Sequence, residues 1–147
     1  MEVVGISFRR AGAEDVEALV GLVLELGYPS PLECVRARLT AIAERSAEVV
    51  LVAEEERRVV GWIHVLEFHS LSSDPCALIA GLVVADGARG RGIGRALVQR
   101  AEAWARARGL GSLRLRSGEA RRAAHAFYER LGFRLAKRQL QFRKELD

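Results

Sequence analysis

Glycines and arginines alternate in a short segment whose residue types suit the binding of an anion. Residues Gly87 to Gly94 include four glycines, and arginines occupy positions 89, 91 and 95. The apolar run before it, Ala77 to Val84, is typical of a buried strand, and a helix is expected to follow. The first turn of a helix offers unpaired N–H groups and the positive end of the helix dipole. Glycine lets an anion approach that backbone closely. The sequence therefore predicts a phosphate or pyrophosphate site at this turn.

Two common phosphate-binding motifs do not fit this turn. The P-loop pattern requires Lys and then Ser or Thr, but Ile93 and Gly94 occupy those positions. The dinucleotide pattern requires a third glycine where the chain has Arg95. The alternative is a glycine-rich turn that binds no ligand, and the density of glycines and arginines argues against it.

Length and composition limit the class of protein. The 147 residues suit one domain over 1–147, and at 50% hydrophobic and 29% charged they can form a core. The longest apolar stretch, Leu78 to Ala85, is far shorter than the roughly 20 residues of a membrane-spanning helix. No secretory leader is evident at the N-terminus. Cys34, Cys76 and three histidines make neither a disulfide framework nor a zinc pattern. We therefore expect a soluble, cytoplasmic protein with no metal and no membrane partner.

Charge is distributed unevenly along the chain. Residues 1–83 carry 7 Lys and Arg against 13 Asp and Glu, a balance of −6. Residues 84–147 carry 16 against 6, a balance of +10. A basic half suggests an anionic ligand and an acidic half a cationic one, although scattered surface charge alone is the simpler alternative.

The hydrophobic pattern predicts a mixed α/β domain around a central sheet. Strands are expected over 6–9, 49–53, 59–68, 77–84 and 113–116, with one or two more within 133–146. Helices are expected to begin near residues 16, 31, 93 and 120. For the second helix, Ser30 is expected as the N-cap and Glu33 as its capping-box partner. Residues 71–75 are expected to form a loop.

Two motifs resemble those of one enzyme family. Arg89-Gly90-Arg91-Gly92-Ile93-Gly94 matches the [QR]-x-x-G-x-[GA] signature of the GNAT superfamily of acyl-CoA-dependent N-acetyltransferases. About 35 residues later, the segment Ala124 to Phe133 is similar to the family's A-x-x-[FL]-Y-x-x-x-G-F segment. The resemblance covers essentially the whole chain. It implies one mostly antiparallel sheet flanked by helices, in the order strand, two helices, three strands, helix, strand, helix and two strands.

The resemblance implies acetyl-CoA as co-substrate. In this family the strand that corresponds to Leu82, Val83 and Val84 pairs with the pantetheine arm where it splays from the next strand. A backbone N–H near Leu82 or Val83 would polarise the thioester carbonyl. The pyrophosphate would contact the glycine turn, and the residues implied there are Arg89, Gly90, Arg91, Gly92, Ile93, Gly94 and Arg95.

The second motif implies a general acid. Tyr128 matches the tyrosine that protonates the leaving thiolate in relatives; an ordinary core aromatic is the alternative. Many relatives carry a cofactor-contacting Asn seven residues earlier, where this chain has Arg121. Arg121 either contacts a phosphate in its place or is an exposed helix residue.

The general base is not evident from the sequence. Several relatives carry a Glu on the strand before the glycine turn, but residues 77–84 of this chain include none that can titrate. His64, Glu67, His69 and Asp74 are the candidates, although a lone histidine on a strand is more often a packed or edge residue. His125 is less favoured because relatives vary there, and Cys76 lacks a Cys/His frame.

The sequence therefore predicts acetyl transfer to a primary amine, either a small cationic amine or a peptide amine. Glu25, Glu67 and Asp74 are expected near the acceptor, where they would attract a cation. A non-catalytic acyl-CoA-binding domain is the alternative. A nucleic-acid-binding module is disfavoured because the aromatic residues of the basic half occupy mostly core-facing positions. A homodimer through the last strands is common in the family.

Overall fold

The computed structural model describes residues 2–147. Its strands are β1 (Ser7–Arg10), β2 (Glu48–Glu55), β3 (Arg58–Ser70), β4 (Ser73–Val84) and β5 (Leu113–Leu115). Its helices are η1 (Ala13–Asp15), α1 (Val16–Glu25), α2 (Leu32–Ala43), η2 (Asp86–Ala88), α3 (Ile93–Ala107) and α4 (Arg122–Arg130). The chain divides into two compact units at Arg116 and Ser117, and each is described by itself.

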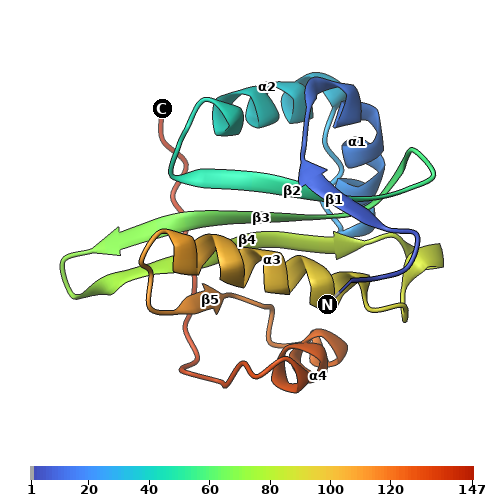
Figure 1. Ribbon diagram of the computed structural model, residues 1–147. Helices are drawn as coiled ribbons and strands as arrows, with labels where there is room; N and C mark the ends of the chain where they lie inside the picture. The colour runs from blue at the N-terminus through green and yellow to red at the C-terminus, as the bar shows by residue number, and fades with distance from the viewer. Residues whose placement is uncertain (1) are drawn as a thin grey trace. The chain divides into compact units, whose positions relative to one another are not determined.

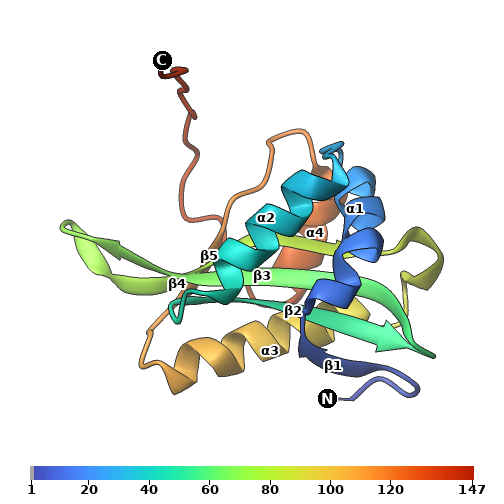
Figure 2. The same cartoon turned by 90° about the horizontal axis from the view of Figure 1, so that it is seen from above.

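The first unit is built on a five-stranded sheet in the order β1-β2-β3-β4-β5. Neighbouring strands are antiparallel, except that β4 and β5 run parallel. Helices α1 and α2 cover one face of the sheet and α3 covers the other (Figures 1 and 2). This arrangement confirms the predicted fold class, a single, mostly antiparallel sheet flanked by helices.

The pattern of apolar residues explains why the helices cover both faces. On the α1–α2 face, Val50 and Val52 of β2 pack in one cluster with Leu19, Val35 and Leu39 of the helices. On the other face α3 comes so close that a Cβ at Gly61 would lie 3.3 Å from Leu97 Cδ1. Because β3 is central, Ile63 and Val65 are fully buried.

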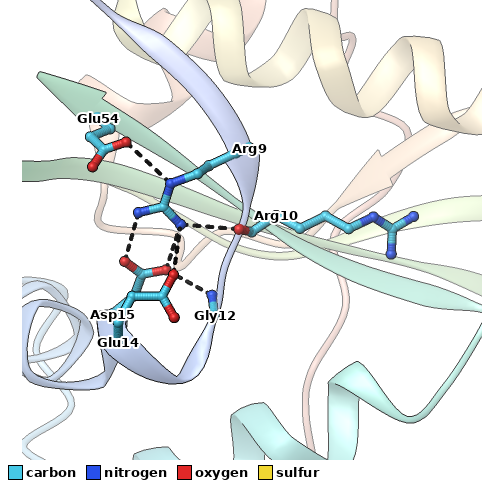
Figure 3. Close-up of polar contacts among 6 residues, drawn as sticks. All are labelled: Arg9, Arg10, Gly12, Glu14, Asp15 and Glu54. Atoms are coloured by element: carbon cyan, nitrogen blue, oxygen red, sulfur yellow. Dashed lines mark hydrogen bonds and ion pairs between the residues drawn. The ribbon is translucent and has the colours of Figure 1, made fainter. Parts of the chain in front are cut away.

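An ion-pair cluster joins β1, η1 and β2 (Figure 3). Arg9 donates to both oxygens of Asp15 at 2.8 and 2.9 Å, and its Nε donates to Glu54 at 3.1 Å. The buried Asp15 carboxylate also accepts a 2.7 Å hydrogen bond from Gly12 N–H. The Arg9 guanidinium holds the pKa of Asp15 below its usual range through these hydrogen bonds. The cluster fixes the start of α1 against the first two strands.

Two local expectations about the first unit are wrong. Ser30 is not a helix cap: α2 begins at Leu32 after Pro31, and Ser30 Oγ instead bonds Tyr28 C=O and Arg38. Pro31 is the N-cap residue instead; its C=O accepts from Cys34 and Val35 N–H, and no side chain caps the helix. The loop expected over 71–75 is shorter, because β4 begins at Ser73 and pairs it with Ser70. The β3–β4 hairpin therefore extends well past the helices (Figure 2).

The second unit contains α4, which ends where Gly132 adopts a φ of +95°. The one or two strands expected within 133–146 are not formed in the described residues, so this part of the prediction is wrong. The apolar residues that suggested them, Leu135, Leu140 and Phe142, are exposed. A strand needs a hydrogen-bonding partner, and the apolar pattern alone does not supply one.

None of the helices within residues 2–147 has the length and apolar character needed to cross a membrane.

Candidate functional site

The two edges of β4 differ along its length. Ala77, Leu78 and Ile79 pair with β3 on one side and with Leu113, Arg114 and Leu115 of β5 on the other. We call Ala77–Ile79 the closed segment. From Ala80 to Val84 only β3 is paired with β4 within the first unit. We call Ala80–Val84 the open segment, and its free edge is where the sequence predicted that the next strand would splay away.

A β-bulge separates the two segments. The register of β3 and β4 shifts by one residue between His64↔Gly81 and Val65↔Ile79, so Ala80 is the extra residue. A bulge bends a strand and interrupts its ladder, and bulges are common beside functional sites. The bulge therefore marks the point at which β4 stops pairing with β5.

The backbone of the open segment has hydrogen-bonding groups to offer. Ala85 N–H donates to Val60 C=O of β3 at 2.8 Å. Because successive backbone groups in an antiparallel strand point to alternate sides, Val83 N–H also points toward β3. Leu82 and Val84 then direct their N–H and C=O groups to the free edge, where the Val84 C=O already accepts a 3.1 Å hydrogen bond from Arg89 Nε. Of the two donors that the sequence left open, Leu82 is the one with an available N–H.

The glycine turn continues directly from the open segment into α3. Gly90 and Gly92 adopt φ of +77° and +84°, which other residue types rarely adopt. A Cβ at Gly90 would meet nothing within 4 Å, so the space before this backbone is open. Gly92 is the N-cap of α3, and neither a side-chain cap nor an acidic residue occupies the first turn. The free N–H groups of Ile93, Gly94 and Arg95 are therefore available to an anion.

The three arginines of the turn are not equivalent. Arg89 donates to Val84 C=O at 3.1 Å and to Asp86 at 3.2 Å. Arg91 makes a two-pronged ion pair with Glu55 at the end of β2, which lowers the pKa of Glu55. Arg95 is exposed and makes no ion pair within residues 2–147. Of the three, only Arg95 can bind an anion without first breaking an ion pair with a carboxylate.

Tyr128 lies on α4 in the second unit. Its ring makes edge-to-face contacts with Phe127 and Phe133, at centroid distances of 5.3 and 5.7 Å. Burial raises the pKa of Tyr128, and Arg121 acts in the opposite direction. The phenol therefore carries its proton at neutral pH, as a proton donor must.

Arg121 and His125 flank the start of α4. Arg121 is exposed at the N-cap position, with its side chain close to Gly118. His125 Nε2 donates to Gly118 C=O at 2.8 Å, so the ring holds the turn before the helix. This contact gives His125 a structural role within the second unit.

The candidate bases occupy different places on β3 and β4. His64 pairs with Gly81 of the open segment, and its Nε2 lies 3.1 Å from Glu48 Oε1. Glu67 is opposite Ala77 of the closed segment, and its carboxylate accepts hydrogen bonds from His69 and Arg108. Asp74 lies in β4 and not in a loop, near the exposed tip of the hairpin. Of these candidates, only His64 is level with the open segment.

The acidic residues expected near the acceptor are largely engaged. Glu25 accepts a 3.0 Å hydrogen bond from Asp86 N–H, which links α1 to the start of the glycine turn. Glu67 is neutralised by Arg108, and Glu33 lies 3.9 Å from Arg36. The negative balance of the first 83 residues therefore gives less free carboxylate than the sequence suggested.

Sequence reasoning missed the bulge at Ala80 and two long-range partners, Glu48 of His64 and Glu55 of Arg91. Alanine carries no bulge signal. The register of the β2–β3 hairpin, Glu48↔Leu66 and Val50↔His64, holds the information for the first pair. Its two-residue turn, Glu56 and Arg57, has positive φ values without the glycine that usually marks such a turn.

Comparison with known proteins gives consistent results. The family model described as "Acetyltransferase (GNAT) family" matches residues 17–133. The uncharacterized N-acetyltransferase YhdJ of Bacillus subtilis (strain 168) is 30% identical over 113 residues, 76% of this chain and 80% of the relative.

Solved structures share the fold. A protein from Agrobacterium tumefaciens str. C58 is 30% identical and has a TM-score of 0.83, covering 94% of this chain and 99% of its own. Aminoglycoside N-acetyltransferase AAC(6')-Iy, in a complex with CoA, is 18% identical and has a TM-score of 0.86 over 96% of this chain and 95% of its own. At that identity the second likeness concerns the fold alone.

Proposed function

Because the chain belongs to the GNAT acetyltransferase family, we propose that it transfers an acetyl group from acetyl-CoA to a primary amine by direct attack in a ternary complex. The observation that carries this proposal is the open segment of β4, whose free edge leads directly into the glycine turn. Backbone groups for an extended chain and helix amides for an anion thus follow one another. Acetyl-CoA has the same sequence of parts, a pantetheine arm and then a pyrophosphate.

Most of the proposed contacts to acetyl-CoA come from backbone groups of the open segment and of the glycine turn. Leu82 offers its N–H and C=O at the free edge, Val84 offers its N–H, and Val83 holds the segment to β3. Leu82 N–H is the donor to the thioester carbonyl, where it stabilises the negative charge that develops during attack. Gly90, Gly92 and the first turn of α3 receive the pyrophosphate. The turn residues in this role are Arg89, Gly90, Arg91, Gly92, Ile93, Gly94 and Arg95, with Arg121 as a further phosphate contact.

Tyr128 is the proposed general acid. Attack of the amine nitrogen on the thioester carbon breaks the C–S bond, and the leaving thiolate takes the phenol proton. The raised pKa of Tyr128 keeps that proton in place until the thiolate forms. A general acid contributes about 10²–10⁴-fold to such a step.

A small cationic amine or a peptide amine is the proposed acceptor. The aminoglycoside N-acetyltransferase of the same fold acts on an amine by its name, and this supports a small-molecule acceptor. Although Glu25 and Glu67 are engaged, the net charge of −6 over the first 83 residues supports a cationic one through its long-range field. We further propose that residues 1–147 form one N-acetyltransferase domain, since the family match spans both units. A cytoplasmic location and a homodimer are also proposed, on the family resemblance.

A screen of amine-dependent CoA release tests the function. The protein is mixed with acetyl-CoA and either no amine, spermidine, kanamycin, an amino acid or a lysine peptide. We expect free thiol to appear fastest with a cationic amine and the acetylated amine to appear in mass spectra. CoA binding without acetylation of any amine would favour the non-catalytic binding domain instead.

A further inference from the structure

The open segment of β4 contains no side chain that can accept a proton. Its residues are Ala80, Gly81, Leu82, Val83 and Val84. An acceptor amine is protonated at neutral pH and must lose a proton before it attacks. The base therefore has to come from a neighbouring element or from water.

Among the β3 residues that face the open segment, His64 alone can titrate. The four pairs are Gly61↔Val84, Trp62↔Val83, Ile63↔Leu82 and His64↔Gly81. His64 is opposite the residue that follows the bulge, where β4 leaves β5. Residues directly opposite in an antiparallel pair share one face of the sheet. For His64 this is the face covered by α1 and α2, because its partner on β2, Val50, lies in their core cluster.

Because Gly81 has no side chain, β4 places no side chain beside His64. A Cβ at Gly81 would lie 2.6 Å from Cζ3 of Trp62, so the indole takes that space. The Trp62 Nε1–H is buried and has no hydrogen-bond partner within residues 2–147. A buried donor without a partner is costly, and water or a bound polar group usually satisfies it. The Trp62 Nε1–H is therefore, besides His64, a second polar group on this face that a bound polar ligand or a water can contact.

Glu48 fixes the state of the His64 ring. Its Oε1 lies 3.1 Å from His64 Nε2, and the two side chains are only 13% and 18% exposed. A carboxylate accepts and cannot donate, so Nε2 carries a proton, and in the neutral ring the free lone pair is on Nδ1. A carboxylate also orients the general-base imidazole of the Ser-His-Asp triad, there through Nδ1, so the two ring nitrogens exchange roles here.

Few other charges act on this pair. Arg45 Nη1 lies 3.7 Å from Glu48 Oε2, on the side away from the ring contact. The apolar cluster on this face of β2 and β3 includes the helix residues Val16, Leu19, Val35 and Leu39. No titratable residue of β4 faces His64. Among the ion pairs within residues 2–147, Glu48 is the charged partner of His64, and Arg45 is a second charged partner of Glu48.

We propose that His64, held by Glu48, is the base that deprotonates the acceptor amine. This inference rests on the proposed acetyl transfer. The ammonium gives one proton to His64 Nδ1, directly or through one water. The neutral amine then forms the C–N bond as the C–S bond breaks, and His64 releases its proton to solvent. The nitrogen loses its second proton to solvent as the amide forms, and Tyr128, which gave its proton to the thiolate, takes one back from solvent. Glu48 acts through His64 and is a positioning residue.

Paired variants test this inference, with His69→Gln as the matched control. His69 is also on β3 and also bonds a carboxylate, that of Glu67 at 2.9 Å, but it lies beyond the open segment. Rates of spermidine and lysine-peptide acetylation are measured from pH 6 to pH 10. We expect His64→Gln to lower kcat/KM about 100-fold at neutral pH, and the deficit to shrink as the amine loses its own proton at high pH. Glu48→Gln should give the same trend with a smaller loss, and His69→Gln should match the parent.

The outcomes separate the two proposals. A parent protein that binds CoA but acetylates no amine would refute the proposed function, and the role of His64 with it. An active parent with an unchanged pH profile in His64→Gln would overturn only the role of His64. A loss that is equal at every pH, with a lower melting temperature or weaker CoA binding, would assign His64 a structural role and also overturn it.

Discussion

The closed and open segments of β4 are consecutive in the sequence and differ mainly in what occupies their second edge. Both are apolar and both pair with β3. Ala77–Ile79 has β5 on its other side, whereas Ala80–Val84 has a free edge that ends at the glycine turn. A strand closed on both edges contributes stability, and an open one can bind a ligand through its backbone. We therefore propose that function here depends more on where strand pairing stops than on which side chains the strand carries.

The largest expected effect concerns a group that the open segment lacks. The open segment has no side chain that can donate a proton to the leaving thiolate, so we assign this role to Tyr128. We expect Tyr128→Phe to lower kcat about 100-fold and to leave the affinity for CoA within a few-fold. Steady-state kinetics and calorimetry measure the two quantities. An unchanged kcat would mean that water protonates the thiolate and that Tyr128 only packs against Phe127 and Phe133.

The turn at the end of the open segment should be the next most sensitive position. Gly92→Val places a branched side chain at a φ of +84° and in front of the helix amides. We expect the Kd for CoA to rise about 30-fold, which corresponds to roughly 2 kcal/mol. Gly109→Val is the matched control, because Gly109 has a φ of +73° at the other end of α3. If both variants fold and bind CoA equally well, the turn does not hold the pyrophosphate.

The closed segment should affect stability without affecting binding. Ile79 is 6% exposed and pairs on both edges. Ile79→Val removes one buried methylene, and we expect the free energy of unfolding to fall by about 1 kcal/mol. Chemical denaturation measures the loss, while the CoA affinity should stay within twofold. A clear fall in CoA affinity would show that the two segments do not divide these roles.

The smallest effect is expected from Arg95, the arginine at the end of the glycine turn. Arg95 has no carboxylate partner within residues 2–147, and an exposed charge contact contributes about 0.5–1 kcal/mol. Arg95→Ala should therefore weaken CoA binding about threefold, and less so at high salt. Arg106→Ala, near the other end of α3, is the control. Equal effects of the two substitutions would point to general charge and not to a local contact.

The sequence predicted the parts of this site that depend on local signals. The strand, the glycine turn and α3 follow one another within the segment 77–107, and four glycines with positive charge mark the turn. Tyr128 was found through a motif, and its assigned role stays a prediction. The fold class is confirmed, since hydrophobic period and turn residues are also local properties.

Other features depend on contacts between distant residues. Ala80 is the bulge because of the register between β3 and β4, and nothing in the residue type signals it. Glu48 meets His64 only once the β2–β3 hairpin is aligned. The strands expected after Gly132 fail for the same reason: Leu135, Leu140 and Phe142 gave a pattern, but pairing requires a second strand.

Hydrogen exchange of the β4 amides, with and without CoA, tests the central claim most directly. Without CoA, the N–H groups of Leu82 and Val84 should exchange quickly, while that of Ala77, which donates to Ser112 C=O at 2.9 Å, should be protected. With CoA bound, Leu82 and Val84 should become protected, and Ala77 should change little. If CoA binds and these two amides continue to exchange at their free rates, the open segment is not the binding edge.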